Sequence, residues 1–119
     1  CDDEQTKQMI GRMYRDNHYL IDTHTAVAFH VLEQYRKKTG DNTLTIVAST
    51  ASPFKFCNSV LNALGETELE AGTKILKQLS DRTGVPVPTP LATLDGKPAR
   101  FDRCIEKEAM EEEVQTFLK

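Results

Sequence analysis

Three hydroxyl side chains and one lysine lie close together near the middle of the chain. Ser49, Thr50 and Ser52 supply the hydroxyl groups, and Lys55 follows them in what reads as the first turn of a helix. A positive charge at that place opposes the helix dipole, so the lysine would be better placed facing an anion. This stretch therefore predicts a site for phosphate or carboxylate, with a solvated surface lysine as the alternative.

A second polar group comes earlier, directly before an apolar helix. Asp22 or Thr23 is a candidate N-cap, and His24 and Thr25 fall in the first turn. The free N–H groups at the start of a helix attract anions. Two interpretations stay open for this group. It lines a ligand site, or it caps a buried helix in which His24 is a structural hydrogen-bonding residue.

Regular elements adjoin both polar groups. Residues 43–49 are rich in β-branched side chains and predict a strand that is apolar on both faces near its end, as interior parallel strands are. The chain then turns at Pro53, and residues 55–64 predict a helix. Open α/β sheets bind ligands at the carboxyl ends of strands that lead into such turns. The earlier group begins a helix over residues 24–38, which closes at Gly40.

Three further segments have the apolar periodicity of helices. They cover residues 2–17, 68–82 and 107–118. The last of them is expected to turn its apolar side chains inward, namely Val114, Phe117 and Leu118.

The fold class that these elements predict is α/β, with helices packed on a small, mostly parallel sheet in a single domain over residues 1–119. A parallel strand buried on both faces needs neighbours. Brief strands at residues 19–21 and 99–101 supply them, or the missing strands lie upstream. The chain begins at Cys1 without a methionine, which suits a segment from a longer polypeptide and equally a processed or tagged protein.

Composition indicates a cytoplasmic globular protein. The 119 residues are 39% hydrophobic and 28% charged, with a net charge of −3. This balance provides no basic surface for nucleic acid, and no apolar run approaches the ~20 residues that span a bilayer. Cys1, Cys57 and Cys104 are widely spaced without a metal-binding pattern, so reduced thiols are expected and no metal site.

Both polar groups resemble C-terminal motifs of bacterial and fungal threonine synthases. Residues 22–28 read DTHTAVA and residues 49–56 read STASPFKF, where the family typically reads DPHTAVA and STAHPAKF. The resemblance also covers the YLID approach to the first motif, the TGVPVP segment and the acidic terminal helix. The chain departs from the pattern at Thr23, where proline is usual, and at residues 52–54, where His-Pro-Ala is common.

The resemblance implies a fold-type II enzyme that uses pyridoxal 5′-phosphate. This family converts O-phosphohomoserine and water to L-threonine and phosphate. In enzymes of this fold a hydroxyl at the end of a late strand contacts the pyridine nitrogen of the cofactor, and Thr50 holds that position here. The resemblance implies a substrate-binding set around it, made of Asp22, His24, Thr25, Ser49, Ser52 and Lys55.

The resemblance also implies what this chain does not carry. The cofactor lysine and the loops that hold the cofactor phosphate belong to segments upstream of those matched here. The 119-residue chain is therefore expected to be inactive by itself, with the remainder of a threonine synthase as its partner. The alternatives are a stand-alone module that binds a small anion or a protein, and another fold-type II enzyme acting on an amino acid.

Overall fold

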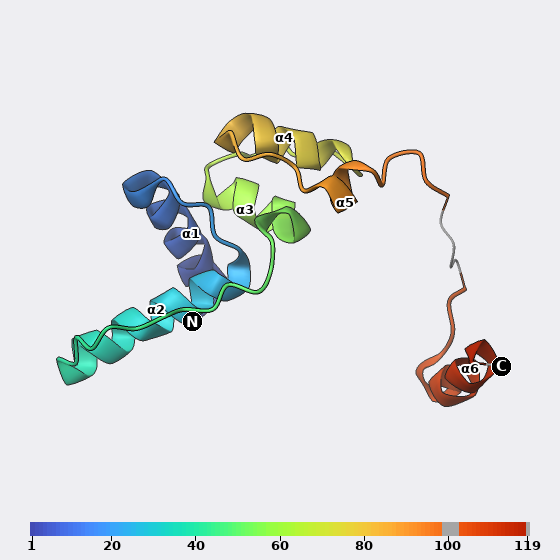
Figure 1. Ribbon diagram of the computed structural model, residues 1–119, viewed down its shortest axis with the longest axis horizontal. Coiled ribbons are helices and arrows are strands. Elements are labelled where there is room, and N and C mark those ends of the chain that lie inside the picture. Colours follow the sequence, from blue (N-terminus) through green and yellow to red (C-terminus); the bar gives the residue numbers. More distant parts are fainter. Residues whose placement is uncertain (99–102, 119) are drawn as a thin grey trace.

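Eight helical segments and no strand make up the part of the chain that the structure describes, residues 1–98 and 103–118 (Figure 1). The structure is a computed structural model. In chain order the elements are α1 (Asp3–Asn17), α2 (Thr23–Thr39), the 3₁₀ helix η1 (Pro53–Phe56), α3 (Cys57–Ala63), α4 (Lys74–Thr83), α5 (Thr89–Ala92), the 3₁₀ helix η2 (Lys107–Ala109) and α6 (Met110–Phe117).

Capping residues in the sequence determine where the first two helices begin and end. Asp2 accepts a hydrogen bond from the backbone N–H of Gln5 at 2.8 Å, and the Gln5 side chain accepts one from the backbone of Asp2 at 3.0 Å. This reciprocal pair satisfies N–H groups that the first turn of α1 leaves free. Helix α2 begins after Asp22 and ends at Gly40 in the left-handed conformation, as the sequence predicts.

The core lies where α1, α3, α4 and the start of α2 meet. Ile10, Leu61 and Leu79 are completely buried there, on three different helices. Ile21, in the loop before α2, completes the contact between the first two helices and the rest. This cluster fixes the position of Asp22, the next residue, against the body of the protein.

Gly11 lets α1 and α3 approach closely. A Cβ atom at this position would lie 2.6 Å from the backbone oxygen of Ala63. Alanine normally stabilises a helix interior relative to glycine by roughly 0.5–1 kcal/mol. Here the steric clash is with backbone, which cannot rotate away, so the clash outweighs the propensity gain.

The variant Gly11→Ala is therefore expected to be less stable than the unmodified chain, by roughly 1–3 kcal/mol. Urea unfolding followed by far-UV circular dichroism measures the difference. Gln8→Ala is the matched control, because Gln8 is exposed on the same helix. A Gly11→Ala variant as stable as this control would contradict the close contact.

Helix α6 lies apart from helices α1 to α5 (Figure 1). It packs with η2, and its apolar side chains are exposed. The prediction that Val114, Phe117 and Leu118 face inward is therefore wrong.

The predicted α/β fold class is wrong as well. Residues 43–49 are extended, but they form no strand, and no described residue pairs with them in a ladder. Residues 19–21 form the loop between α1 and α2. The expected strand at residues 99–101 lies outside the described residues. A segment with β-branched side chains becomes a strand only when neighbouring backbone supplies hydrogen bonds, and α-helices supply none.

Helix α4 begins at Lys74, later than the sequence predicts. Gly72 has φ +61°, a left-handed conformation that interrupts a helix. The side chain of Gln78 holds the preceding loop, because it accepts from the backbone N–H of Glu70 at 2.9 Å and donates to the carbonyl of Glu68 at 2.8 Å. Within the described residues, none of the helices has both the length and the hydrophobicity needed to cross a bilayer.

Candidate functional site

A buried carboxylate connects the two polar groups of the sequence. Asp22 is 0% exposed, and its Oδ1 accepts hydrogen bonds from the backbone N–H groups of His24 at 2.8 Å and Thr25 at 3.2 Å. Its Oδ2 accepts from the hydroxyl of Thr25. Ser49 Oγ lies 2.8 Å from Thr25 Oγ1 and 3.4 Å from Asp22 Oδ2. Asp22, Thr25 and Ser49, hereafter the Asp22 cluster, thus join the start of α2 to the end of the extended segment.

Hydrogen bonding keeps this carboxylate ionised. Burial raises the pKa of Asp22, but the bonds from the Thr25 hydroxyl and from the backbone N–H groups of Thr25 and His24 outweigh it, and the pKa lies below its ordinary value. The same bonds use the N–H groups of His24 and Thr25 in the first turn of α2. Those groups are therefore engaged by Asp22 and are not free to bind an external anion, which decides between the two candidate caps in favour of Asp22.

The turn after Ser49 is held by a second cap. Ser52 Oγ accepts from the backbone N–H of Phe54 at 3.3 Å, and Pro53 occupies the first position of η1. Lys55 follows on the exposed side of η1. Ser52 therefore has a structural hydrogen bond of its own, whereas Lys55 presents its charge to solvent.

Thr50 lies between these two anchored points. Its side chain is exposed, and its hydroxyl makes no hydrogen bond with the described residues. The Asp22 cluster fixes the backbone on one side and the Ser52 cap fixes it on the other. The backbone at Thr50 is thus held on both sides, and its hydroxyl is free to bind another group.

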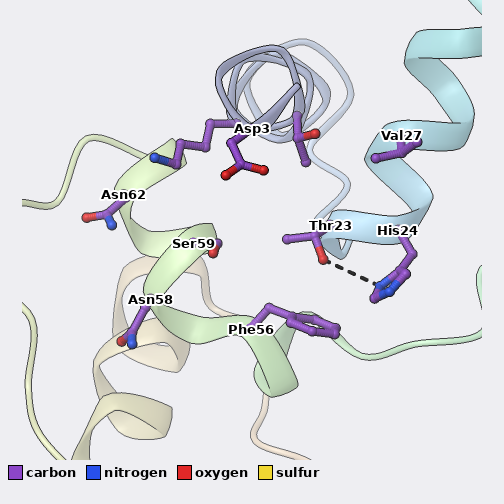
Figure 2. A pocket seen from close by; sticks show the side chains of 10 residues that line it. Asp3, Thr23, His24, Val27, Phe56, Asn58, Ser59 and Asn62 are labelled. Carbon is purple, nitrogen blue, oxygen red and sulfur yellow. Dashed lines mark hydrogen bonds between the residues drawn. The ribbon is translucent and has the colours of Figure 1, made fainter. Parts of the chain in front are cut away.

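His24 lies at the edge of a cleft of about 430 Å³ between α1, α2 and α3 (Figure 2). Its ring packs at a tilt against Phe56, with 5.1 Å between ring centroids. Its Nδ1 lies 3.4 Å from the hydroxyl of Thr23. The other side chains that line the cleft are mostly polar and come from α1 and α3, namely Asp3, Thr6, Lys7, Asn58, Ser59 and Asn62, with Val27 from α2.

Lys55 borders a different cleft, of about 440 Å³, between η1, α3 and α4. The predicted site residues therefore lie at several separate locations. Asp22, Thr25 and Ser49 meet in the Asp22 cluster, His24 borders the first cleft, and Thr50 lines neither cleft. The described part of the chain does not enclose them in a single cavity.

Comparison with protein families shows the family to which the chain belongs. The family model described as "Threonine synthase, C-terminal" matches residues 25–118. The chain belongs to the threonine synthase C-terminal family. The match includes Thr25, Ser49, Thr50 and Lys55, while Asp22 and His24 lie just before it.

Individual threonine synthases are similar to parts of the chain. The enzyme of Saccharomyces cerevisiae is 36% identical over 66 residues, which are 51% of this chain and 13% of that protein. The enzyme of Schizosaccharomyces pombe is 35% identical over 75 residues, 61% of this chain and 15% of that protein. The mouse protein named threonine synthase-like 1 is 30% identical over 115 residues, 96% of this chain and 14% of that protein. The chain thus spans about one seventh of the length of these relatives.

Several cleft residues of this family member were not predicted from its sequence. Lys7 lies on the amphipathic helix α1, and no motif around it marked it as a site residue. Asn58 and Asn62 lie four positions apart in the sequence, so they lie on one side of α3. This spacing was the signal that could have predicted them. A polar pair with that spacing, directly after the 49–56 motif, indicates that this side of α3 faces solvent.

Cys57 is a structural thiol. Its Sγ is buried and donates to the carbonyl oxygen of Phe54 at 3.2 Å, and burial raises the pKa of the thiol. Cys1 and Cys104 are exposed. Because the thiolate is the reactive form, Cys57 is expected to react with a disulfide reagent roughly a hundredfold more slowly than the other two thiols. Absorbance after addition of Ellman's reagent counts fast and slow thiols, and three fast thiols would contradict the burial.

Proposed function

We propose that the chain is the C-terminal portion of a pyridoxal-phosphate-dependent threonine synthase. That enzyme would convert O-phosphohomoserine and water to L-threonine and phosphate. The observation that carries the proposal is the family match over residues 25–118, which contains the turn from Ser49 to Lys55. The relatives from both yeasts are named threonine synthases.

Thr50 would hold the cofactor ring through its pyridine nitrogen. Its exposed hydroxyl has no partner among the described residues, which suits a group that must meet an external acceptor or donor. The bound cofactor would supply an electron sink for the substrate carbon atoms. A neutral hydroxyl does not keep the ring nitrogen protonated as a carboxylate would, so Thr50 would moderate that electron sink.

The remaining residues of the motif would divide between positioning and contact. The polar atoms of Asp22, Thr25 and Ser49 bond to one another, so these three would position the turn. Lys55 is exposed and cationic, which fits attraction of the substrate phosphate. His24 would contact substrate at the edge of its cleft, and Ser52 would support the turn on which Lys55 lies.

The remainder of the enzyme would cover the extended segment. Leu44 and Ile46 are 92% and 91% exposed, and they alternate with threonines along residues 43–46. Two large apolar side chains left in water in this way favour contact with another protein surface. The cofactor lysine would come from that same remainder, because the chain spans only about one seventh of its relatives.

The proposal predicts activity in the full-length enzyme and none in the 119-residue chain. Release of phosphate from O-phosphohomoserine, with threonine counted by amino-acid analysis, is expected for the full-length protein supplied with pyridoxal phosphate. Borohydride is expected to fix the cofactor to one lysine of the full-length protein and to no single lysine of the 119-residue chain.

Two results would contradict the proposal. Stoichiometric fixation at a single lysine of the 119-residue chain would refute its inactivity. A full-length protein that releases no phosphate would favour the alternative, a module that binds a small anion or a protein. Binding of inorganic phosphate to that inactive protein, measured by calorimetry, would then separate the anion-binding alternative from the protein-binding one.

A further inference from the structure

Helix α2 carries an apolar stripe that the body of the protein covers only in part. Val27, Val31 and Tyr35 follow one another at intervals of four residues, so they lie along one side of the helix. They are 38–50% exposed. The stripe is about 12 Å long at 1.5 Å per residue. Lys38, seven residues after Val31, continues it toward the end of the helix.

Helix α6 carries a stripe of the same spacing. Met110, Val114 and Leu118 are separated by the same four-residue intervals and are 55–76% exposed. Glu111 lies seven residues before Leu118, and therefore on the same side. The two stripes thus match in length and in the distance between their side chains.

The charges at the ends of the two helices are complementary. The last turn of α2 contains Arg36, Lys37 and Lys38, and the first turn of α6 contains Glu111, Glu112 and Glu113. When the helices run antiparallel, these two turns face each other. The negative end of one helix dipole then also lies beside the positive end of the other, which is favourable. In a parallel arrangement neither turn meets an opposite charge. Lys38 and Glu111 form no ion pair within the described part of the chain.

The two helices of one chain lie at opposite ends of the molecule, whose longest extent is 55 Å (Figure 1). Helix α6 therefore does not reach the α2 stripe of its own chain in this structure. We propose that α6 packs antiparallel on the α2 stripe of a second copy. A twofold arrangement makes the contact twice, since each copy offers one α6 and receives the other. This inference does not depend on the cofactor or the substrate.

The oligomeric state of the 119-residue chain tests this proposal. Sedimentation equilibrium in reducing buffer is expected to give twice the chain mass of 13.4 kDa, with reductant excluding disulfides between exposed Cys1 or Cys104. Val31→Asp and Val114→Asp are each expected to weaken the dimer about tenfold or more. Leu94→Asp, a half-exposed apolar residue outside both stripes, is the matched control and is expected to leave the dimer unchanged.

Mixing and charge reversal identify the contact itself. An equimolar mixture of Val31→Asp and Val114→Asp chains keeps one of the two contacts intact, so mixed dimers are expected to form more tightly than either variant with itself. Lys38→Glu and Glu111→Lys are each expected to weaken the dimer, and both changes in one chain are expected to restore it.

Three results would overturn the proposal. The chain could have a mass of 13.4 kDa at every concentration, which would leave both stripes to another partner. Val114→Asp could leave a dimer unchanged, which would indicate contact between two α2 helices. The combined charge reversal could fail to restore the dimer, which would exclude the antiparallel pairing.

Discussion

Replacing Asp22 with alanine is expected to lower the free energy of unfolding by roughly 3 kcal/mol, because it removes a helix cap and a buried acceptor together. The carboxylate is fully buried and accepts from two backbone N–H groups and from the hydroxyl of Thr25. Alanine would leave the two backbone N–H groups without this acceptor, and the Thr25 hydroxyl would keep only its contact with Ser49. Chemical unfolding followed by circular dichroism measures the loss.

Asp2→Ala is the matched control, because Asp2 caps α1 in the same way but is exposed. Water can replace its carboxylate, so its loss is expected to cost only about 1 kcal/mol. Equal losses for the two variants would contradict the account of Asp22 as a buried anchor.

Asp22 is also expected to make stability depend on pH. The folded pKa lies below the ordinary value of about 3.9, so the carboxylate contributes stability above that value and the contribution is lost as pH falls through the lower folded pKa. Asp22→Asn removes this ionisation. Its stability is therefore expected to fall less between neutral pH and strong acid than that of the unmodified chain.

The second large effect is expected at Thr50 in the full-length threonine synthase. Thr50→Val keeps the shape of the side chain but removes the hydroxyl proposed to contact the cofactor. Loss of one neutral hydrogen bond of about 1 kcal/mol predicts a fall in kcat of roughly fivefold to tenfold. Steady-state phosphate release measures it, and Thr50→Ser, which retains a hydroxyl, is expected to recover most of the rate.

Thr67→Val controls for the loss of an exposed threonine hydroxyl elsewhere on the chain. This variant is expected to keep the unmodified rate. If Thr50→Val were as active as Thr67→Val, the hydroxyl of Thr50 would have no part in cofactor binding.

Features that depend on local chemistry could be predicted from the sequence. The capping aspartate before α2 and Gly40 after it determine that helix through hydrogen bonds within a few residues. Such features need only neighbours in the chain, so the sequence contains all the partners involved.

Features that depend on distant partners could not be predicted in this way. The β-branched side chains of residues 43–49 favour a strand, but the described helices offer no backbone edge for pairing. The cleft beside His24 combines Lys7 with Asn58 from another helix, and no short motif contains both. The hydrogen bond from Ser49 to Asp22 likewise joins residues 27 positions apart.

The most direct test of the central claim is an experimental structure of the full-length enzyme with pyridoxal phosphate bound. The account predicts that Thr50 Oγ1 lies within hydrogen-bonding distance of the pyridine nitrogen, about 3 Å or less. A ring nitrogen held by another residue, with the Thr50 hydroxyl turned toward solvent, would contradict it.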